Sequence, residues 1–446
     1  MAMAAKPLSP VAALRVGLAG LGTVGGGVMS VLLRNAEEIG RRAGRPIQIV
    51  AVADLDSAKR KEAQSSGVAT FENALEMLEK SKLDVLIELI GGYGFAKELV
   101  LAAVDRGLNV VTANKALLAV HGNEIFAKAE AKGATVAFEA AVAGGIPIIK
   151  ALREGLVANQ ILSVAGIING TTNFILSEMR EKGLSFAQVL AEAQRLGYAE
   201  ADPTFDVEGV DAAHKITLLC AMAFGMSVRF EQAHIEGISR LDSQDIAYAD
   251  RLGYRIKLLG ITRRRPNGVE LRVHPTLIPA KRLIANVEGA MNAVVVRGDA
   301  VGETLYYGKG AGAEPTASAV IADLVDLARS ADVPASSRVP HLGFQPNHRE
   351  ELQVLPIDSI ESGYYLRLRV SDESGVLADI TRVLADSKIS IDAFFQREAD
   401  DGQNQTDVIL LTHSCKESQI LAALKTISSL KTVLAAPVML RVESFE

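Results

Sequence analysis

The sequence has only two cysteines, no long apolar run and no excess of basic residues. Cys220 and Cys415 are far apart and lack metal-ligand spacing, which argues against a disulfide framework and a zinc cluster. We expect two buried thiols in a reducing cytoplasm. The most apolar stretches, such as 218–226, fall well short of the roughly 18 residues that a membrane span requires. The first ten residues lack the apolar segment of a secretory signal. These absences predict a soluble, cytoplasmic protein with no membrane partner.

Charge and length narrow the class further. Lys and Arg total 47 against 53 Asp and Glu, so the formal net charge is −6. Such a chain has no basic surplus to neutralise a phosphate backbone, so we do not expect nucleic acid as its main partner. A composition of 49% hydrophobic and 22% charged residues is that of an ordinary globular protein. At roughly 150 residues per domain, the 446 residues predict about three domains.

The first third of the chain alternates strand-like apolar runs with helix-length segments. The expected strands are 14–20, 47–54, 84–89, 109–113 and 135–140. A helix of about 24–42 follows the first of them. This alternation predicts a parallel sheet with crossover helices, and hence an α/β domain of the Rossmann type over 14–140.

The remaining residues predict two further domains and a linker. Over 141–332 helical patterns give way to β-rich stretches, which indicates an α+β domain with its own sheet. We expect its last helix, 315–331, to be able to pack back on the first domain. Residues 333–362 carry four prolines and no clear period, which indicates a linker. From 363 to 446 the expected order is βαββαβ, a ferredoxin-like unit.

The sharpest local motif is Gly20-Leu21-Gly22-Thr23-Val24-Gly25. It follows a predicted strand and opens a predicted helix, which is the setting in which such a motif binds a dinucleotide. The glycines allow a tight turn, close approach of the pyrophosphate and close packing of the helix on the strand. The phosphates then bind N–H groups at the helix N-terminus. We therefore expect NAD or NADP as the cofactor.

The end of the second strand bears on which dinucleotide is bound. Asp54 lies at about the right distance to accept a hydrogen bond from the ribose 2′-hydroxyl of NAD. Lys59, Arg60 and Lys61 follow closely. They could meet a 2′-phosphate, or they could form a solvated helix face. The sequence alone leaves the choice between NAD and NADP open.

An acid-rich loop leads into a helix that carries a lysine. Glu200, Asp206 and Asp211 belong to this segment, and Lys215 lies four residues after Asp211, on the same helix face. One interpretation is a surface ion pair with acids favoured at a helix N-terminus. The other is a substrate site, with carboxylates for a substrate ammonium group and a lysine that donates a proton to a carbonyl oxygen. The dinucleotide domain upstream favours the second interpretation.

Lys115 closes the segment Thr-Ala-Asn-Lys at 112–115, just after the predicted strand 109–113. Doubly wound sheets bind their ligands at the carboxyl ends of parallel strands. Lys115 is therefore either part of the site or a surface lysine whose stem lies along apolar surface.

Five segments of the chain match one family: GLGTVG at 20–25, TANK at 112–115, EAAVAGGIPII at 139–149, NGTTNFIL at 169–176 and GYAEADPTFDVEGVDAAHK at 197–215. Together they resemble homoserine dehydrogenase, in its long bacterial form with a C-terminal ACT domain. The resemblance extends from about Leu14 to Val442. In the last domain it rests on Asp372, Gly375, Val376, Leu377 and the stretch 389–391.

The resemblance implies a reversible NAD(P)H-dependent reduction of L-aspartate 4-semialdehyde to L-homoserine, on the route to threonine, methionine and isoleucine. It implies that Lys215 protonates the aldehyde oxygen as hydride arrives, with Asp211 beside it. It also implies that Glu200 and Asp206 bind the substrate, and that Lys115 contacts cofactor and substrate.

The resemblance implies further ligands and contacts. Gly91 and Gly310 match positions near the nicotinamide half of the cofactor. A sodium ion is implied, bound by the carboxylate of Glu139 and by three main-chain carbonyl groups, those of Val142, Gly144 and Ile146. Ligation by oxygen alone suits a hard cation.

The resemblance also bears on assembly and regulation. It implies a dimer formed through the middle domain, and ACT pairing could extend this to a tetramer. The expected effector of the ACT domain is L-threonine, with a pure dimerisation role as the alternative. Such regulation requires two domain arrangements that differ in threonine affinity and communicate through 333–362.

One departure from the family pattern concerns the cofactor. NADP-preferring members often carry arginine where this chain has Ala53, just before Asp54. The loss of that guanidinium group removes a bidentate clamp on the 2′-phosphate. The sequence therefore admits NAD, or the use of both dinucleotides.

Two other functions compete with this one. Another Rossmann-plus-ACT dehydrogenase, of the prephenate or phosphoglycerate type, would need a catalytic histidine. The seven histidines, among them His121, His214, His234 and His274, are not among the residues expected to do chemistry. A non-enzymatic amino-acid sensor with a vestigial Rossmann half is the other alternative. The intact set of Lys115, Glu200, Asp211 and Lys215 argues against it.

Overall fold

The structure, a computed structural model, describes residues 12–396 and 404–445. Contacts among residues divide the chain into two compact units. The first unit comprises the described residues up to Leu162 together with Thr217–Phe230 and Val296–Glu351. The second comprises Ser163–Ile216, Glu231–Val295 and the described residues from Leu352 onward. Because each unit combines separate stretches of the chain, the domain boundaries expected from the sequence stay predictions.

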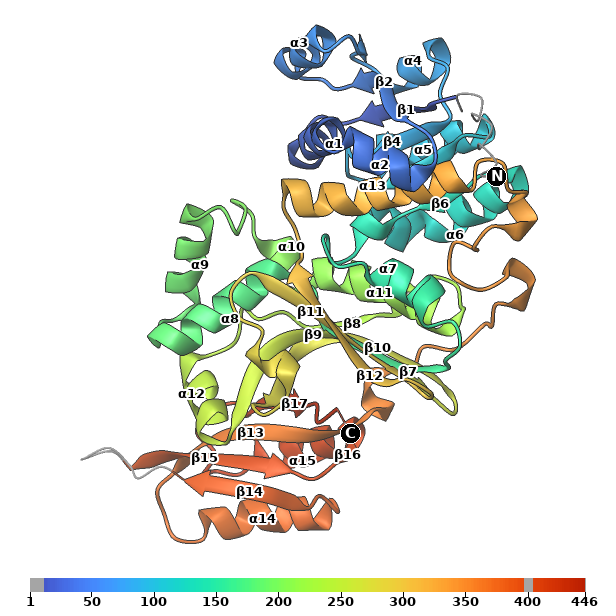
Figure 1. Ribbon diagram of the computed structural model, residues 1–446. Helices are drawn as coiled ribbons and strands as arrows, with labels where there is room; N and C mark the ends of the chain where they lie inside the picture. Colours follow the sequence, from blue (N-terminus) through green and yellow to red (C-terminus); the bar gives the residue numbers. More distant parts are fainter. Residues whose placement is uncertain (1–11, 397–403, 446) are drawn as a thin grey trace, which may run out of the picture. The chain divides into compact units, whose positions relative to one another are not determined.

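A six-stranded parallel sheet forms the centre of the first unit (Figure 1). Its order is β3-β2-β1-β4-β5-β6, so the direction of winding reverses between β1 and β4. In doubly wound sheets this reversal opens the crevice that binds ligands. The strands are β1 (Leu14–Ala19), β2 (Ile47–Ala53), β3 (Ala69–Phe71), β4 (Val85–Glu88), β5 (Asn109–Thr112) and β6 (Val136–Ala137). The Rossmann-type fold expected from the sequence is confirmed.

Helices connect the strands of this sheet. They are α1 (Thr23–Arg34), α2 (Ala36–Ala43), α3 (Ser57–Ser65), α4 (Ala74–Lys80), α5 (Gly94–Asp105) and α6 (Lys115–Lys132). The single helix expected over 24–42 is wrong, because Asn35 leaves helical geometry, ending α1 and preceding α2. The strand expected over 135–140 is also too long, since a 3₁₀ turn begins at Glu139.

A late segment of the chain completes the core of the first unit. Helix α13 (Ala313–Arg329) buries Val320 and Leu324 in the same hydrophobic cluster as Val28 of α1. Figure 1 shows α13, in orange, next to α1 and α2. The other elements of this unit are η1 (Glu139–Ala141), α7 (Ile148–Lys150), η2 (Ala151–Gly155), β12 (Gly302–Lys309), η5 (Ala335–Ser337) and η6 (Pro346–His348).

A mixed sheet runs through the second unit in the order β11-β7-β9-β10-β17-β13-β15-β14. Its earlier strands are β7 (Ile161–Ile167), β8 (His234–Ile235, which pairs with β10), β9 (Tyr254–Arg265), β10 (Gly268–Pro279) and β11 (Met291–Gly298). The helices are α8 (Gly170–Lys182), α9 (Phe186–Arg195), α10 (Thr204–Val207), α11 (Val210–Phe224, in this unit up to Ile216) and α12 (Ser243–Arg251).

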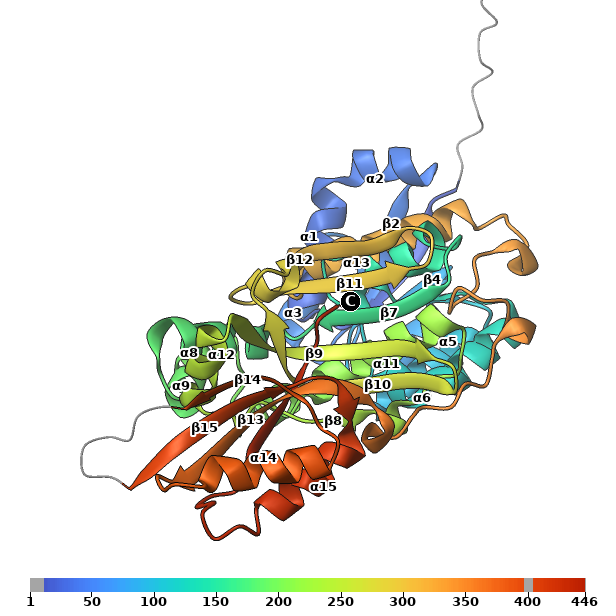
Figure 2. The same ribbon diagram turned by 90° about the horizontal axis from the view of Figure 1, so that it is seen from below.

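The last part of the second unit has the expected βαββαβ order. Its elements are β13 (Glu361–Ser371), α14 (Val376–Asp386), β14 (Ile391–Gln396), β15 (Gln405–Thr412), α15 (Glu417–Ile427) and β17 (Val438–Val442), with the short β16 (Cys415–Lys416) beside β13. Leu366, Ile380 and Ile420 are fully buried between the strands and the two helices. Figure 2 shows α14 and α15 on one face of these strands. The ferredoxin-like fold is confirmed.

This C-terminal part is joined to the preceding strands by more than a linker. β17 pairs in parallel with β10, with Arg441 opposite Thr276 and Val442 opposite Leu277. The sheet of the ferredoxin-like part is therefore a continuation of the sheet that precedes it. The linker is therefore not the only connection between the ferredoxin-like part and the strands that precede it.

Two further expectations concern burial. Cys220 and Cys415 are both buried thiols, as expected. Among the described helices, none is both long enough and apolar enough to cross a membrane.

Candidate active site

The glycine-rich turn leads from β1 into α1 as expected. Gly20 has φ +97°, a conformation that glycine adopts without strain. A Cβ atom on Gly25 would collide with the carbonyl oxygen of Gly20, so the helix can approach the strand only through glycine. No side chain caps the first turn of α1, which leaves its N–H groups to face an anion. An open groove of about 540 Å³ lies here, lined by Gly22, Thr23 and Lys59 among others.

Asp54 lies directly against this turn. Its carboxylate accepts hydrogen bonds from the N–H of Leu21 at 2.5 Å and from that of Asp56 at 2.8 Å. The acid is therefore fixed where a ribose would meet the glycine turn. The basic residues that follow lie in different settings. Arg60 donates to the main-chain carbonyls of Asp54 and Leu55, whereas Lys59 lines the groove.

A buried carboxylate organises the loops at the carboxyl ends of β4 and β5. One oxygen of Glu88 accepts the N–H groups of Ile90 and Gly91, and the other accepts the hydroxyl of Thr112 at 2.6 Å. Glu88 is fully buried. This arrangement shapes the loop that carries Gly91, whose φ is +82°. Sequence reasoning missed Glu88, although an acid that closes an apolar strand was the signal used for Asp54.

Lys115 is placed by the loop that follows β5. The hydroxyl of Thr112 accepts the N–H of Asn114, and the side chain of Asn114 donates to the carbonyl of Gly92. Asn114 also caps α6 by accepting the N–H of Leu117 at 3.0 Å. Lys115 is the first residue of that helix. Its main chain is therefore fixed at the carboxyl end of the sheet, where a ligand is expected.

The segment expected to bind sodium forms a tight curl within the first unit. Ala143 and Gly144 both have positive φ, 54° and 47°, which turns the chain sharply after Val142. The loop lies so close to Gly310 that a Cβ on Gly144 would collide with its carbonyl oxygen. Glu139 is buried and accepts the N–H groups of Ile149 and Lys150 at 2.9 and 2.8 Å.

Burial raises the pKa of Glu139 to about 7, more than the N–H groups it accepts can offset. A buried carboxyl group in this state favours a neighbouring cation, which would hold it ionised. Within the described part of the chain, no three side chains of His, Cys, Asp or Glu cluster as ligands of a metal. The carboxylate of Asp323 also lies beside Glu139 and accepts its N–H at 2.9 Å. Carboxylates together with main-chain carbonyl oxygens would be a donor set for a hard alkali cation. The residues present therefore fit sodium.

The lysine of α11 forms a buried ion pair. Nζ of Lys215 lies 2.7 Å from Oδ2 of Asp211, and the two side chains are only 11% and 5% exposed. The same Nζ donates to the main-chain carbonyl of Ile168 at 2.8 Å. Of the two interpretations that the sequence left open, a solvated surface pair is inconsistent with this burial. A charge buried to this extent needs such partners.

Asn169 connects this pair to a second carboxylate. Its side-chain amide donates to Asp206 at 2.7 Å and to Asp211 at 2.8 Å. The structure thus brings Asp206, Asp211 and Lys215 together, within the second unit. Glu200 has an exposed side chain in the segment after α9. Asn169 had no role in the sequence analysis, although it stands in one of the matched segments.

His214 is buried next to the predicted proton donor. It immediately precedes Lys215 in α11 and is fully buried. Its ring centroid lies 5.3 Å from that of Phe205, so it packs under the acid-rich segment. None of the sequence-predicted roles involves its imidazole.

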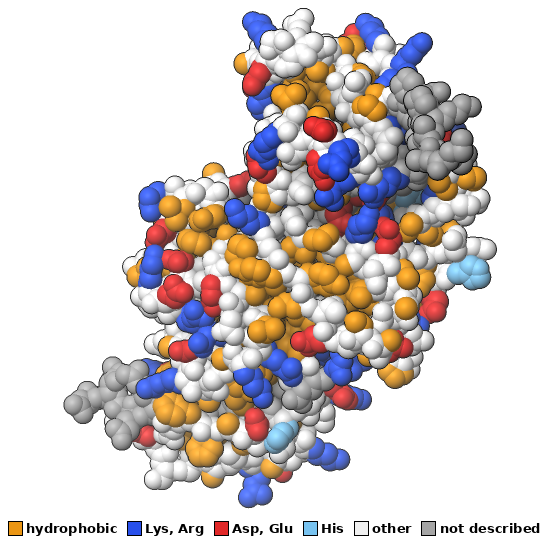
Figure 3. Space-filling view, viewed as in Figure 1, with side chains coloured by type: hydrophobic (Ala, Val, Ile, Leu, Met, Phe, Trp, Pro, Cys, Tyr) orange, Lys and Arg blue, Asp and Glu red, His pale blue; other side chains and the backbone are white. Residues whose placement is uncertain are grey.

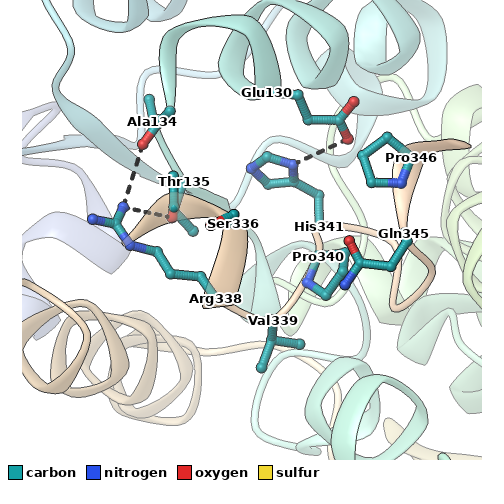
Figure 4. A pocket seen from close by; sticks show the side chains of 12 residues that line it. Glu130, Ala134, Thr135, Ser336, Arg338, Val339, Pro340, His341, Gln345 and Pro346 are labelled. Atoms are coloured by element: carbon teal, nitrogen blue, oxygen red, sulfur yellow. Dashed lines mark hydrogen bonds and ion pairs between the residues drawn. The ribbon is translucent and has the colours of Figure 1, made fainter. Parts of the chain in front are cut away.

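A second cavity in the first unit holds none of the predicted site residues. It has a volume of about 260 Å³ and lies between the end of α6 and the segment 335–346 (Figure 4). Glu130 is paired there with His341 and Arg349. Burial alone would raise the pKa of Glu130, but these two partners bring it below its ordinary value. The cavity therefore marks where part of the expected linker packs.

These two sets of residues define the class of protein. A glycine turn at the switch point of a doubly wound sheet holds a dinucleotide, and a buried lysine can move a proton at a carbonyl or hydroxyl oxygen. The chain is an NAD(P)-dependent oxidoreductase that acts on a CH–OH group.

Family models match most of the chain. Residues 20–139 match the NAD-binding domain of homoserine dehydrogenase, residues 147–325 match homoserine dehydrogenase and residues 364–432 match the ACT domain. The chain belongs to the homoserine dehydrogenase family, which confirms the resemblance drawn from the sequence.

Individual relatives agree with this assignment. A homoserine dehydrogenase of Pseudomonas aeruginosa is 57% identical over 96% of this chain and 99% of its own length. A crystal structure of a homoserine dehydrogenase from Thiobacillus denitrificans is 59% identical, with a TM-score of 0.93 over 98% of this chain and 99% of that one. A hyperthermophilic archaeal homoserine dehydrogenase in complex with NADPH is 26% identical, with a TM-score of 0.61 over 72% of this chain and 99% of that one. The comparisons do not favour another dehydrogenase or a sensor.

The close approach at Gly25 generates a prediction. Gly25→Ala should weaken the binding of both NADH and NADPH by at least about tenfold, because the added methyl group pushes α1 away from the glycine turn. Isothermal titration calorimetry would measure both affinities. Gly40→Ala is the matched control, since that Cβ meets nothing closer than 3.9 Å. Unchanged affinity in Gly25→Ala would show that the dinucleotide does not depend on this turn.

Proposed function

We propose that the chain interconverts L-homoserine and L-aspartate 4-semialdehyde, a step on the route to threonine, methionine and isoleucine. The observation that supports this is the cluster of the buried residues Lys215, Asp211 and Asn169 with the partly buried Asp206. When bound, the nicotinamide dinucleotide supplies or accepts the hydride. The chain's own residues bind the amino acid and move the proton at its C4 oxygen.

We assign the proton transfer to Lys215. In the reductive direction its ammonium group donates a proton to the carbonyl oxygen, and in the oxidative direction the neutral amine accepts the hydroxyl proton. Asp211 and the carbonyl of Ile168 orient Nζ from two sides. Their role is to hold the amine at one place, which contributes to the rate because the reacting atoms must be aligned.

Carboxylates in this site would bind the substrate's ammonium group. We assign this role to Asp206 and Glu200. Asp206 is held in place by the Asn169 amide, which donates to its carboxylate at 2.7 Å. The exposed side chain of Glu200 can turn toward a bound substrate. We assign to Lys115, at the start of α6, contacts with both cofactor and substrate.

The assignment of Lys215 predicts a selective loss of turnover. Lys215→Ala should lower kcat by about 100-fold or more while dinucleotide affinity is unchanged, because general acid–base catalysis typically contributes 10²–10⁴. Steady-state kinetics with homoserine, together with calorimetry for the dinucleotide, would measure both. Lys182→Ala removes an exposed lysine of α8 and serves as control. Turnover near that of the wild type in Lys215→Ala would refute the assignment.

Cofactor choice follows from the residues at the end of β2. We propose that NAD(H) works at least comparably with NADP(H), because Asp54 repels a 2′-phosphate and Ala53 supplies no guanidinium group. Lys59 acts in the opposite sense, since it lines the groove beside the glycine turn. The balance between these two charges sets the preference.

Kinetics with both dinucleotides would test this balance. We expect values of kcat/KM for NADH and NADPH that differ by less than about tenfold. Lys59→Ala should lower kcat/KM for NADPH and leave that for NADH unchanged. Lys61→Ala is the control within the same triplet. A hundredfold preference for NADPH in the wild type would show that the basic residues override Asp54.

We also infer a sodium ion bound by Glu139 and the carbonyls of Val142, Gly144 and Ile146. The support is the buried carboxyl group and the curl of the chain at Gly144 described above. Because this curl abuts Gly310, the ion would stiffen a loop that we assign to the nicotinamide end of the cofactor. Gly91 belongs to the same end by its match to the family.

The exposed apolar side chains of the first unit support a homodimer. Val157, Val301 and Tyr307 are 68%, 46% and 58% exposed, and Tyr307 lies on β12. Figure 3 shows hydrophobic side chains grouped over the region of β12, with charged side chains around them. Exposed apolar patches of this kind mark protein–protein interfaces. A tetramer would require additional pairing of the ACT domains.

We propose that the ACT domain binds a small amino acid, with L-threonine as the expected effector. The turn between β13 and α14 ends at Gly375, whose φ is +98°. A Cβ there would meet no other atom within 4 Å, so the backbone of the turn is open to a ligand. Because β17 pairs with β10, deletion of the ACT domain would strip a strand from the sheet. Full-length variants therefore test regulation better than truncation does.

Threonine inhibition should depend on this turn. We expect millimolar threonine to slow the full-length enzyme, and Gly375→Ala to remove the response while leaving the uninhibited rate unchanged. Gly67→Ala is the control, because Gly67 has a similar positive φ of 81° and open space around it. If neither kinetics nor calorimetry detects threonine in the wild type, the ACT domain serves only for dimerisation.

A further inference from the structure

A fully paired arginine joins the last strand of the ACT domain to the short strand β8. Arg441 of β17 is 2% exposed. Two of its nitrogens donate to the two carboxylate oxygens of Glu236, each at 2.9 Å. It also donates to Glu417 of α15 at 2.7 and 2.5 Å. Bidentate pairs of this kind fix geometry as well as charge.

Besides Arg441, two other groups hold Glu236 in place, so it cannot move independently of Arg441. Its carboxylate lies 2.7 Å from Nε2 of His234, and its N–H donates to the carbonyl of Val273 in β10. Burial would raise the pKa of Glu236, but His234 and Arg441 hold it well below its ordinary value. The carboxylate is therefore ionised and strongly bound to the guanidinium group.

The residues after Glu236 lie directly against the substrate segment. A Cβ atom on Gly237 would collide with the carbonyl oxygen of Val207, so the two main chains touch. The N–H of Ile238 donates to that same carbonyl at 2.8 Å. Val207 is the last residue of α10, and its neighbour Asp206 accepts the Asn169 amide. A short chain of contacts thus runs from Arg441 through Glu236 to Asp206.

We propose that Glu236 is a positioning residue for Asp206, and that Arg441 of the ACT domain holds it in place. This inference rests on the assignment of Asp206 to substrate binding made above. Glu236 touches neither substrate nor cofactor in this scheme. It fixes the main chain at 237–238, and this main chain fixes the end of α10. The last strand of the ACT domain thus helps to position a residue of the proposed substrate site.

Glu236→Gln tests the proposal, because it keeps the shape of the side chain and removes its charge. We expect KM for homoserine to rise about tenfold while kcat changes less than about threefold and KM for the dinucleotide is unchanged. Arg441→Lys keeps the charge but loses the bidentate geometry, and should shift KM for homoserine in the same direction to a smaller extent. If Glu236→Gln does not fold, the KM of Arg441→Lys for homoserine tests the proposal in its place.

Asp245→Asn is the matched control. Asp245 is fully buried and accepts two hydrogen bonds from Arg367 of β13, at 2.7 and 2.9 Å. This pair also ties the ACT domain to an earlier element, but to α12 rather than to the segment beside α10. Its loss should lower the melting temperature as Glu236→Gln does, without raising KM for homoserine.

A double-mutant cycle separates positioning from general destabilisation. In an Asp206→Asn background, Glu236→Gln should add little to KM, because both changes act on the same carboxylate. Fully additive effects on KM, or an equal rise in Asp245→Asn, would overturn the proposal. If the wild type does not turn over homoserine at all, the proposed function fails. If the wild type is active and KM for homoserine is unaltered in the variants, only the positioning role of Glu236 fails.

Discussion

A charge removed from water must find a partner in the protein, and this constraint determines the geometry of both compact units. The cost of burying an unpaired ion is several kcal/mol, and removing one member of a buried pair costs about 3–5 kcal/mol. Glu88 meets the constraint with main-chain N–H groups and a hydroxyl, and Lys215 meets it with Asp211. Arg441 meets it with two carboxylates. Each of these groups fixes the loops around it, and some of these loops carry residues that we assign to the site.

The same constraint fixes the cluster that we assign to substrate binding. Asp206 and Asp211 are two like charges that would repel each other, and the amide of Asn169 donates to both. Lys215 supplies the opposite charge beside Asp211. A site assembled in advance has little left to reorganise during the reaction, which is a main source of catalytic rate.

Local patterns in the sequence predicted those features that depend on neighbouring residues. The glycine motif, the acid at the end of β2 and the four-residue spacing of Asp211 and Lys215 are all local, and the structure places each of them in the expected element. The break at Asn35 was missed because apolar periodicity continues across it, whereas the backbone does not remain helical.

Features that depend on distant residues could not be predicted in this way. The burial of Lys215 requires the carbonyl of Ile168, which lies 47 residues earlier in the chain. The pairing of Glu236 with Arg441 joins residues 205 apart. Glu236 alone reads as an ordinary surface acid after a short strand, since its partner is known only once β17 is placed next to β10.

The pairing of β17 with β10 has a consequence for the synthesis of the chain on the ribosome. Ribosomes make β17 about 160 residues after β10, which at 5–20 residues per second takes roughly 10–30 s. During that time the edge of β10 lacks this strand, and the carboxylate of Glu236 lacks its arginine. Exposed strand edges in nascent chains pair with one another and aggregate. The nascent chain should therefore depend on chaperones to shield this edge until synthesis reaches β17.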